Sequence, residues 1–319
     1  MHEFELISKH FLDLSKKNKS SLDLNDDVFF DKSKKLVVSV DTYVEGVHFI
    51  NFKKPDLVIK KIIRSSISDL ICKGVKPKYY FISGSGNHKS FSSSNLVKIS
   101  QSLKQEQKKY KVFLSGGDTV WSKKLSFTIT SIGFSKKIVF RNKAKINDDI
   151  YVTGTLGDSY AGLNILKKKI NTSKILKNYF ENKYYQPSLC LELTDKLLSF
   201  ANTSIDISDG LIADLEKLIN KQKLSYKLDL NNIPISKNLL KLLTTKKLNK
   251  ISFISQGDDY QILFTADPSK FRIISKIAKS SSIKISKIGK ICTPSQKSEI
   301  IDQKGKKIAV KHKGFYHKF

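Results

Sequence analysis

The chain has 319 residues, 39% of them hydrophobic and 10% aromatic, which fits two domains of moderate size and excludes intrinsic disorder. Lysine and arginine number 58 against 29 acidic residues, and the net charge of +29 is compatible with a nucleic-acid or anionic-membrane partner. The basic residues are spread along the whole chain, in pairs such as Lys60-Lys61, so we interpret them as solvated surface produced by compositional drift.

Hydrophobic periodicity predicts alternating helices and strands in the first part of the chain. Phe4, Ile7, Phe11 and Leu14 recur at helical spacing and predict a helix with one face packed on the body. Strands are predicted at 36–40, 79–83, 112–114 and 125–134, and helices at 55–71 and 95–110. The polar segment 136–148 breaks this rhythm and predicts two domains, 1–138 and 139–319.

The second part of the chain repeats the mixed pattern. Strands are predicted at 150–152, 204–207, 226–230, 261–264 and 283–288, and helices from 158 and at 188–200, 211–219 and 270–279. The predicted fold class is therefore α/β with mixed α+β character, in two domains.

The cysteines and the apolar runs indicate a cytoplasmic protein. Cys72, Cys190 and Cys292 are far apart and form no CxxC pair, which argues against a disulfide framework and a zinc site. No apolar stretch approaches the roughly 20 residues that a membrane span needs, and the first residues indicate an amphipathic helix, not a signal peptide.

Acidic residues are scarce, and nine of the 29 form a set whose members mostly lie beside Gly, Ser or Thr at the ends of predicted elements. They are Asp26-Asp27, Asp41, Asp69, Asp118, Asp206, Asp209 and Asp258-Asp259. Crowded carboxylates repel one another unless a cation lies among them, and Mg²⁺ suits such hard oxygen ligands and bridges them to phosphate oxygens. The chain has no G-x-x-x-x-G-K-[ST] loop and no protein-kinase motif set, which disfavours those two nucleotide-binding folds.

The order of these motifs resembles the thiamine-monophosphate kinase family over nearly the whole chain. The matching segments are 25–27, 41–49, 68–70, 116–119, 206–211, 257–260 and 314–317. The most specific are Asp41 to Phe49 and Asp206 to Leu211. The resemblance implies ATP-dependent phosphorylation of thiamine monophosphate to thiamine diphosphate, on the two-domain fold shared with aminoimidazole ribonucleotide synthetase. It also implies a homodimer, in which the N-terminal domains pair into a barrel.

The same resemblance assigns residues to ligands. The implied magnesium ligands are Asp27, Ser39, Asp41, Asp69, Asp118, Asp206 and Asp209. The implied ATP contacts are Gly117, Asp118, Arg141 and Ser208, and the implied thiamine contacts are His48, Asp258 and Phe315. Domain 1–138 would bind ATP and magnesium and form the dimer, and domain 139–319 would complete the nucleotide and substrate site. No protein nucleophile or general base is expected, because the attacking phosphate is already ionised at neutral pH.

Several of these residues also have ordinary structural explanations. Asp69 alone would lie on a solvated helix face, Asp209 would cap the next helix, His48 would be a satisfied loop histidine and Phe315 would anchor the tail. For the acids taken together, that explanation requires a coincidence of order and spacing. We interpret a further set of acids as structural or supporting: Asp26, Asp149, Asp158 and Asp259.

The chain departs from the family pattern at a few positions that concern substrate fit more than the metal cluster. Asn25 and Asp23 replace glycines, and we expect the turn to survive because Asn tolerates positive φ. The other departures are Ser66 for Asn, Gln186 for Arg and Gln256-Gly257-Asp258 for Gly-Gly-Glu. Three alternatives are another ATP-using enzyme of the same fold, a basic nucleic-acid-binding protein, and an inactive homologue. The last is disfavoured because every implied ligand acid is retained.

Overall fold

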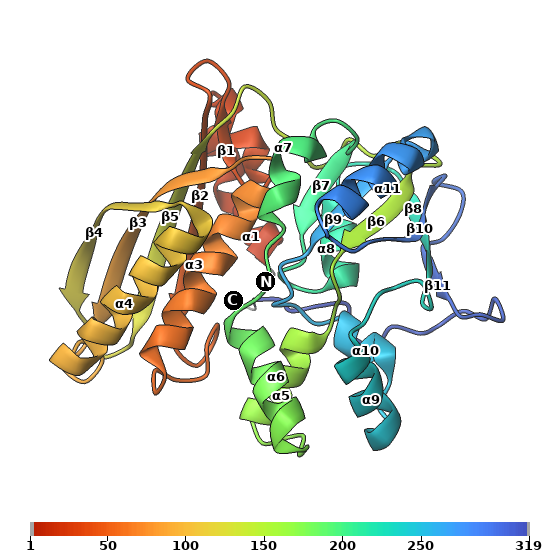
Figure 1. Ribbon diagram of the computed structural model, residues 1–319. Coiled ribbons are helices and arrows are strands. Elements are labelled where there is room, and N and C mark those ends of the chain that lie inside the picture. Colours follow the sequence, from red (N-terminus) through yellow and green to blue (C-terminus); the bar gives the residue numbers. More distant parts are fainter. Residues whose placement is uncertain (1–2, 318–319) are drawn as a thin grey trace.

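The computed structural model describes residues 3–317, in which the chain builds two β-sheets joined through one central helix (Figure 1). The first sheet has the order β1-β2-β5-β3-β4. Its strands are β1 (Phe29–Asp31), β2 (Leu36–Val44), β3 (Pro77–Gly86), β4 (Phe113–Trp121) and β5 (Ser126–Phe134). Helices α3 (Pro55–Cys72) and α4 (Ser93–Tyr110) cover one of its faces. We call this part the N-terminal half.

The second sheet has the order β11-β8-β10-β6-β9-β7. Its strands are β6 (Asp149–Thr153), β7 (Thr203–Asp206), β8 (Ser225–Asp229), β9 (Ile262–Ala266), β10 (Ile285–Cys292) and β11 (Glu299–Ile301). Its helices are α5 (Asp158–Leu166), α6 (Lys174–Tyr185), α7 (Thr194–Leu197), α8 (Leu211–Leu218), α9 (Lys237–Lys246), α10 (Lys250–Ile254) and α11 (Phe271–Ser280), with single 3₁₀ turns at Leu191–Leu193 and Pro268–Lys270. We call this part the C-terminal half.

Helix α3 is the element that joins the two halves. Pro55 starts it at a position where no backbone donor is needed, and Gly74 follows its end at φ +77°. Its apolar residues pack both on the first sheet and on residues of the C-terminal half such as Tyr184 and Phe264, in one continuous core. Because almost the whole helix is buried, its few polar side chains must find partners inside the protein.

Most predicted elements are present, but one predicted helix in the C-terminal half is wrong and several elements there were not predicted. The helix predicted at 188–200 is only a 3₁₀ turn followed by the single turn α7. Helix α6 was not predicted, although Ser173 caps it by accepting a hydrogen bond from the Leu176 amide at 3.5 Å. Helices α9 and α10 and strand β11 were also missed.

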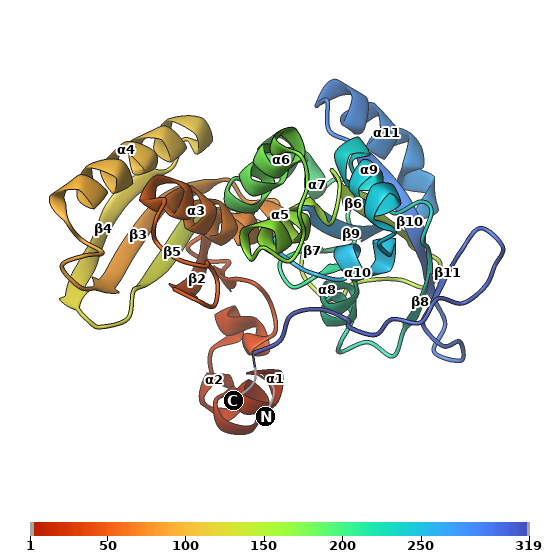
Figure 2. The same ribbon diagram turned by 90° about the horizontal axis from the view of Figure 1, so that it is seen from below.

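The N-terminal segment differs from its prediction. The predicted helix breaks at Phe11 into α1 (Glu3–His10) and α2 (Leu12–Ser15), and the side chain of Phe4 lies outside the described part of the structure. Phe11 and Leu14 are 47% and 81% exposed, so they do not pack on the body, and Figure 2 shows both helices standing apart from it. The prediction of a buried apolar face here is wrong.

The turn before the first acidic pair is strained, but not at the residue we expected. The 3₁₀ segment Lys19–Leu24 holds Leu22, Asp23 and Leu24 at φ between 49° and 57°, whereas Asn25 has φ −129°. Asp23 therefore occupies one of the left-handed positions that favour glycine. Asn25 instead exchanges amide hydrogen bonds of 3.0 and 2.8 Å with Asn220, which follows α8.

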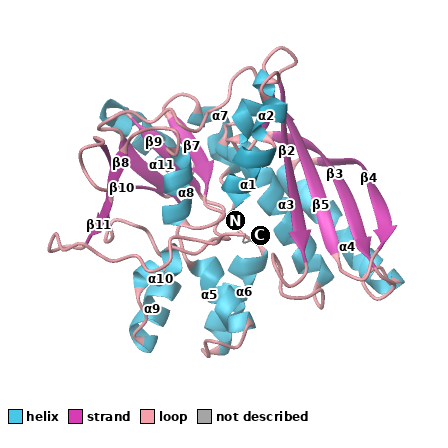
Figure 3. Cartoon of the chain, turned by 180° about the vertical axis from the view of Figure 1, so that it is seen from behind, coloured by secondary structure: helices cyan, strands magenta, loops and turns pink. Residues whose placement is uncertain are grey.

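Strand β4 forms an exposed edge of the first sheet. All nine of its residues are exposed, including Phe113 at 53%, Val120 at 52% and Trp121 at 65%. Seen from behind in Figure 3, no helix of the described chain covers the outer face of β5, β3 and β4. Long, apolar edge strands are surfaces on which another chain pairs.

Among residues 3–317, no helix is both long and apolar enough to cross a membrane.

Candidate active site

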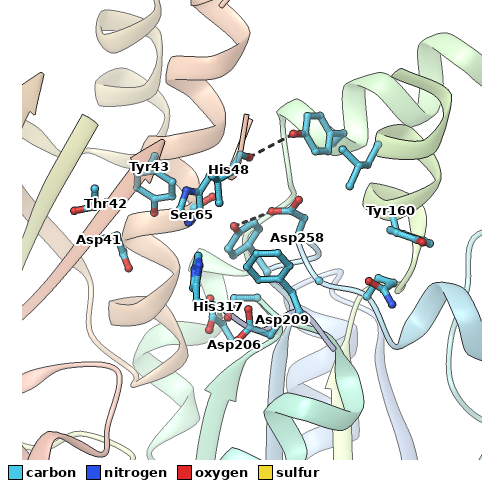
Figure 4. A pocket seen from close by; sticks show the side chains of 18 of the residues that line it. Asp41, Thr42, Tyr43, His48, Ser65, Tyr160, Asp206, Asp209, Asp258 and His317 are labelled. Carbon is cyan, nitrogen blue, oxygen red and sulfur yellow. Dashed lines mark hydrogen bonds between the residues drawn. The ribbon is translucent and has the colours of Figure 1, made fainter. Parts of the chain in front are cut away.

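A cavity of about 370 Å³ lies between the two halves, and we call it the acidic cavity. Eight residues implied by the sequence line it: Asp41, His48, Asp69, Asp206, Ser208, Asp209, Asp258 and Phe315. Asp41 reaches it from β2, whereas Asp206 and Asp209 reach it from the end of β7 and the turn that follows (Figure 4). The fold thus brings together acids separated by up to about two thirds of the chain, from Asp41 to Asp258.

A second cavity, of about 560 Å³, adjoins the first on the side of α1, and we call it the outer cavity. The two cavities share six residues: Asp41, Thr42, His48, Asp209, Phe315 and His317. Two ligands placed in these cavities would therefore meet beside Asp41 and Asp209.

Tight backbone turns hold the acids of the C-terminal half. A side chain at Gly257 would place its Cβ 1.7 Å from the Ser208 carbonyl oxygen, so only glycine fits there. This close approach lets the Asp258 amide donate to the same oxygen at 2.9 Å. The backbone of the segment that carries Asp209 is therefore held directly against the backbone of the segment that carries Asp258.

Three carboxylates form the centre of the acidic cluster. Oxygen atoms of Asp27, Asp69 and Asp206 all lie within 4.8 Å of one another. Ser39 donates a hydrogen bond to Asp69, and Ser68 donates one to Asp206 at 2.7 Å. Asp69 thus faces the site and does not lie on a solvated helix face.

Burial and mutual repulsion shift the pKa values of these acids. Burial raises the pKa of Asp206 to about 7 and that of Asp41 to about 6. Burial, followed by the nearby carboxylates of Asp41 and Asp206, raises the pKa of Asp69 well above its ordinary value. A cation bound among these carboxyl groups would stabilise their ionised forms, and their hard oxygen atoms suit a divalent metal ion such as Mg²⁺. The residues present therefore fit magnesium.

Two cations of the protein already border this cluster. Lys73, whose side chain is fully buried, lies 2.7 Å from both Asp26 Oδ1 and Asp27 Oδ2. Arg141 also pairs with Asp27, and its backbone amide donates to Asp26 at 3.0 Å. Burial lowers the pKa of Arg141. Asp26 thus has the supporting role that we predicted for it, whereas sequence reasoning missed Lys73.

Asp209 does not cap the helix that follows it. Asp214 does so by accepting the Asp209 and Gly210 amides at 2.9 and 3.0 Å. Lys217 pairs with both carboxylates, at 3.1 Å from Asp214. The Asp209 side chain remains 28% exposed and lines both cavities.

The residues implied for substrate binding also line the acidic cavity. Asp258 pairs with Lys61 at 2.7 Å and accepts a hydrogen bond from the Tyr260 hydroxyl at 3.1 Å. Lys61 is only 1% exposed and lies over the Tyr184 ring at 4.1 Å, so our interpretation of it as solvated surface is wrong. The available signal was the pair Lys60-Lys61 between Val58-Ile59 and Ile62-Ile63, because a lysine pair inside such an apolar run places one of its side chains toward the core.

His48 and Phe315 line both cavities, beside Asp41 and Asp209. His48 Nδ1 accepts a hydrogen bond from the Val44 amide at 3.0 Å, and burial lowers the pKa of the imidazole. Phe315 is held by its amide, which donates to the Asp209 carbonyl at 2.9 Å. His317, which we did not single out, packs against both rings, with centroids 5.4 Å from His48 and 5.0 Å from Phe315.

Gly117 and Asp118 are the implied site residues that lie elsewhere. They are within the exposed strand β4, not in a turn after it, and Asp118 pairs in register with Ser83 on β3. Ser83 in turn faces Thr128 on β5, which faces Thr42 on β2. Three strand spacings of about 4.8 Å place Asp118 about 14 Å from the β2 end of the cavity.

The remaining departures and supporting acids have structural partners. Ser66 shares a 2.9 Å hydrogen bond with Ser131, and Gln186 contacts Arg64 at 3.5 Å. The acids that we interpreted as structural also have ordinary partners: Asp149 pairs with Lys287 at 2.7 Å, Asp158 accepts from Ser236 at 2.6 Å, and Asp259 accepts from the Gly157 amide at 2.7 Å.

Comparison with known proteins shows where this fold and site belong. Residues 25–135 match the model of the AIR synthase related protein, N-terminal domain. The chain is 36% identical to the thiamine-monophosphate kinase of Buchnera aphidicola subsp. Acyrthosiphon pisum over 99% of this chain and 98% of that protein. It is 32% identical to the Haemophilus influenzae thiamine-monophosphate kinase over 91% and 89% of the two chains.

A solved structure agrees with these relatives. AaThiL complexed with AMPPCP and TMP superposes with a TM-score of 0.84 at 26% identity, over 99% of this chain and 97% of that one. The match therefore extends over both halves of the chain. The chain belongs to the thiamine-monophosphate kinase family.

Proposed function

We propose that the protein transfers the γ-phosphoryl group of ATP to thiamine monophosphate and so makes thiamine diphosphate. The observation that carries this proposal is the pair of cavities that meet beside the carboxylates of Asp41 and Asp209, since a kinase must bring two phosphorylated substrates together. The family supports the identity of the substrates, because AaThiL was solved with AMPPCP and TMP. The direct test is incubation with ATP, Mg²⁺ and thiamine monophosphate, followed by chromatographic detection of thiamine diphosphate.

We further propose that Asp27, Ser39, Asp41, Asp69, Asp206 and Asp209 hold several Mg²⁺ ions. Bound Mg²⁺ would neutralise the charge of the phosphate groups and of the transition state. The protein itself would act by holding these carboxylates in place through Ser39, Ser68 and Lys73. Arg141 and Ser208 would orient the nucleotide from the two sides of the cluster. No side chain needs to attack or take up a proton, because the acceptor phosphate is already ionised.

The acceptor substrate would lie in the acidic cavity, which His48, Asp258 and Phe315 line. His48, Asp258 and Phe315 would contact the thiamine rings there, while the acceptor phosphate points to the metal cluster. Asp258 is one methylene shorter than the family's usual Glu, and Lys61 and Tyr260 fix its Oδ1 atom. The substitution is therefore expected to alter the affinity for the acceptor more than the rate of phosphoryl transfer. Steady-state constants for the Asp258→Glu variant would measure this effect.

We also propose a homodimer in which the first sheets of two chains pack together. The exposed apolar residues of β4 and the uncovered outer face of its sheet support such a contact. In the dimer, Gly117 and Asp118 of one chain would complete the site of the other, because within one chain they are too far away. Sedimentation or light scattering would measure the oligomeric state.

The domain boundary and the location of the protein remain proposals as well. Residues 135–148 carry no helix or strand, which supports a boundary at 138/139 between an N-terminal domain for ATP, magnesium and dimerisation and a C-terminal domain. All three cysteines are thiols, which supports a reducing cytoplasmic location.

A further inference from the structure

Lys217 stands where the two cavities meet, and neither the sequence motifs nor the family assignment gave it a role. It lies in the last turn of α8, and its side chain is 14% exposed. It lines the outer cavity together with Asp41, Thr42 and Asp209. Its ammonium group pairs with Asp209 and lies 3.1 Å from Asp214 Oδ1.

The two acids that Lys217 contacts are not equivalent. The Asp214 side chain is fully buried, and its other oxygen atom accepts two backbone amides, so it is a permanent anchor. The Asp209 side chain is 28% exposed, lines both cavities and is a proposed magnesium ligand. Asp214 and Lys217 are three residues apart on one helix, a spacing that keeps them in contact. Lys217 can therefore lose contact with Asp209 and keep its contact with Asp214.

We propose that Lys217 is an exchangeable cation that neutralises Asp209 before the nucleotide binds and then contacts the phosphate groups of the nucleotide. An ammonium group and a divalent cation compete for the same carboxylate, so metal binding at Asp209 displaces Lys217. The displaced ammonium remains beside the outer cavity, where it is well placed to bind phosphate oxygens. The inference rests on the proposed function for the identity of the nucleotide.

The proposal predicts two effects of opposite sign in the Lys217→Met variant. Without the competing ammonium, Mn²⁺ alone, measured by paramagnetic resonance in the absence of nucleotide, should bind about threefold to tenfold more tightly. Without the phosphate contact, AMPPCP in saturating Mg²⁺, measured by calorimetry, should bind about tenfold more weakly. A residue with only a structural role would weaken both ligands together, and that outcome would overturn the proposal.

Lys221→Met is the matched control. Lys221 follows the same helix and pairs with Asp23 at 3.3 Å on the surface. Its replacement by Met also removes one positive charge, but at a position that does not contact Asp209. Both dissociation constants should stay within about twofold of those of the unchanged protein. If Lys221→Met gained as much Mn²⁺ affinity as Lys217→Met, the change in net charge alone would explain the gain, and the proposal would be contradicted.

Lys217→Arg provides a second test if the Met variant does not fold, as judged by its melting temperature. Arginine keeps the positive charge and binds phosphate, so AMPPCP affinity should stay within about threefold. A tenfold loss in Lys217→Arg would contradict the proposed phosphate contact. Thiamine monophosphate is absent from all these measurements, so they can succeed even if the acceptor substrate has been misassigned.

Discussion

The acidic cavity and strand β4 both carry aspartates that belong to the sequence motifs, but those of the cavity lie close together inside the chain and the one on β4 is exposed. Asp69 and Asp206 lie within 4.8 Å of each other inside the chain, supported by serine hydroxyls. Asp118 lies on an edge strand whose nine residues are all exposed. One chain therefore brings Asp69 and Asp206 together by itself, whereas Asp118 lies apart from them and, in the proposed dimer, would act in the site of the second chain.

The largest effect should come from the acids inside the chain. Asp69→Asn and Asp209→Asn should each lower kcat/KM at least about 1,000-fold, because each removes a charge from the site that stabilises the transferring phosphoryl group. Measured rates of thiamine diphosphate formation provide the test. Asp195→Asn, which alters an exposed pair with Lys76, is the control and should keep normal activity. Near-normal turnover in both active-site variants would contradict the metal-cluster proposal.

The next experiment asks whether Asp118 acts in the partner's site. Asp118→Asn and Asp209→Asn should each be inactive alone, but mixed dimers would contain one site with both acids intact. If the chains assort randomly, half of the dimers are mixed and half of their sites are whole, so about one quarter of the normal activity should return.

The alternative predicts a different result for the same mixture. If Asp118 serves its own chain, every site in the mixed dimers lacks one of the two acids, and coexpression restores no activity. Coexpression of two copies of Asp118→Asn, distinguished by purification tags, controls for the handling of the protein.

A third prediction concerns the exposed strand itself. Trp121→Lys should weaken the dimer and lower activity at least about tenfold at nanomolar protein concentration, because a charge would have to be desolvated in the interface. The activity should recover as the protein concentration is raised. His88→Lys, at an exposed position in the loop that follows β3, is a control that adds a similar charge without altering β4. A Trp121→Lys protein that remains a dimer and fully active would show that β4 is not the interface.

The smallest effect should be the pH dependence of stability without metal. Asp41 and Asp206 have pKa values raised to about 6 and about 7, so between the unfolded value of about 4 and these values the folded state binds more protons than the unfolded state. Stability should therefore fall as pH rises from about 4 to about 7, with Tm falling by roughly 5 °C. Added Mg²⁺ should reduce this fall, because the ion compensates the ionised carboxylates.

Asp206→Asn should also flatten the pH dependence of Tm measured in a chelating buffer, because it removes one of the two carboxyl groups whose pKa is raised. An unchanged slope in Asp206→Asn would indicate that the buried cluster does not titrate in this range.

Much of the fold followed from local patterns in the chain. Helix α3 was predicted almost to the residue, because Pro55 starts it, Gly74 follows it and apolar residues fill its core positions. The prediction of a helix at 188–200 was wrong, because a 3₁₀ turn followed by a single helical turn is enough to bury the apolar residues of this segment. Helix α6 was missed although Leu176, Phe180 and Tyr184 recur at helical spacing, because polar residues, all Lys, Asn or Glu, make up half of the helix.

Local patterns also misjudged individual charges. Lys61 and Lys60 are neighbours in sequence, but only Lys61 points between the halves, where Asp258 compensates its charge. Lys73 is buried in the same way against Asp26 and Asp27. Whether a lysine is solvated depends on what packs over it, and that information comes from distant parts of the chain.

The sequence by itself determined the order of the acidic motifs, the mixed α/β class and the resemblance to one kinase family, because these depend on residue identity and short spacing. Only the tertiary structure decided which acids meet, because β2, α3 and β7 converge through contacts between distant segments. It also showed that Asp118 lies apart from them on β4, since strand order in a sheet cannot be inferred from the spacing of the strands along the chain.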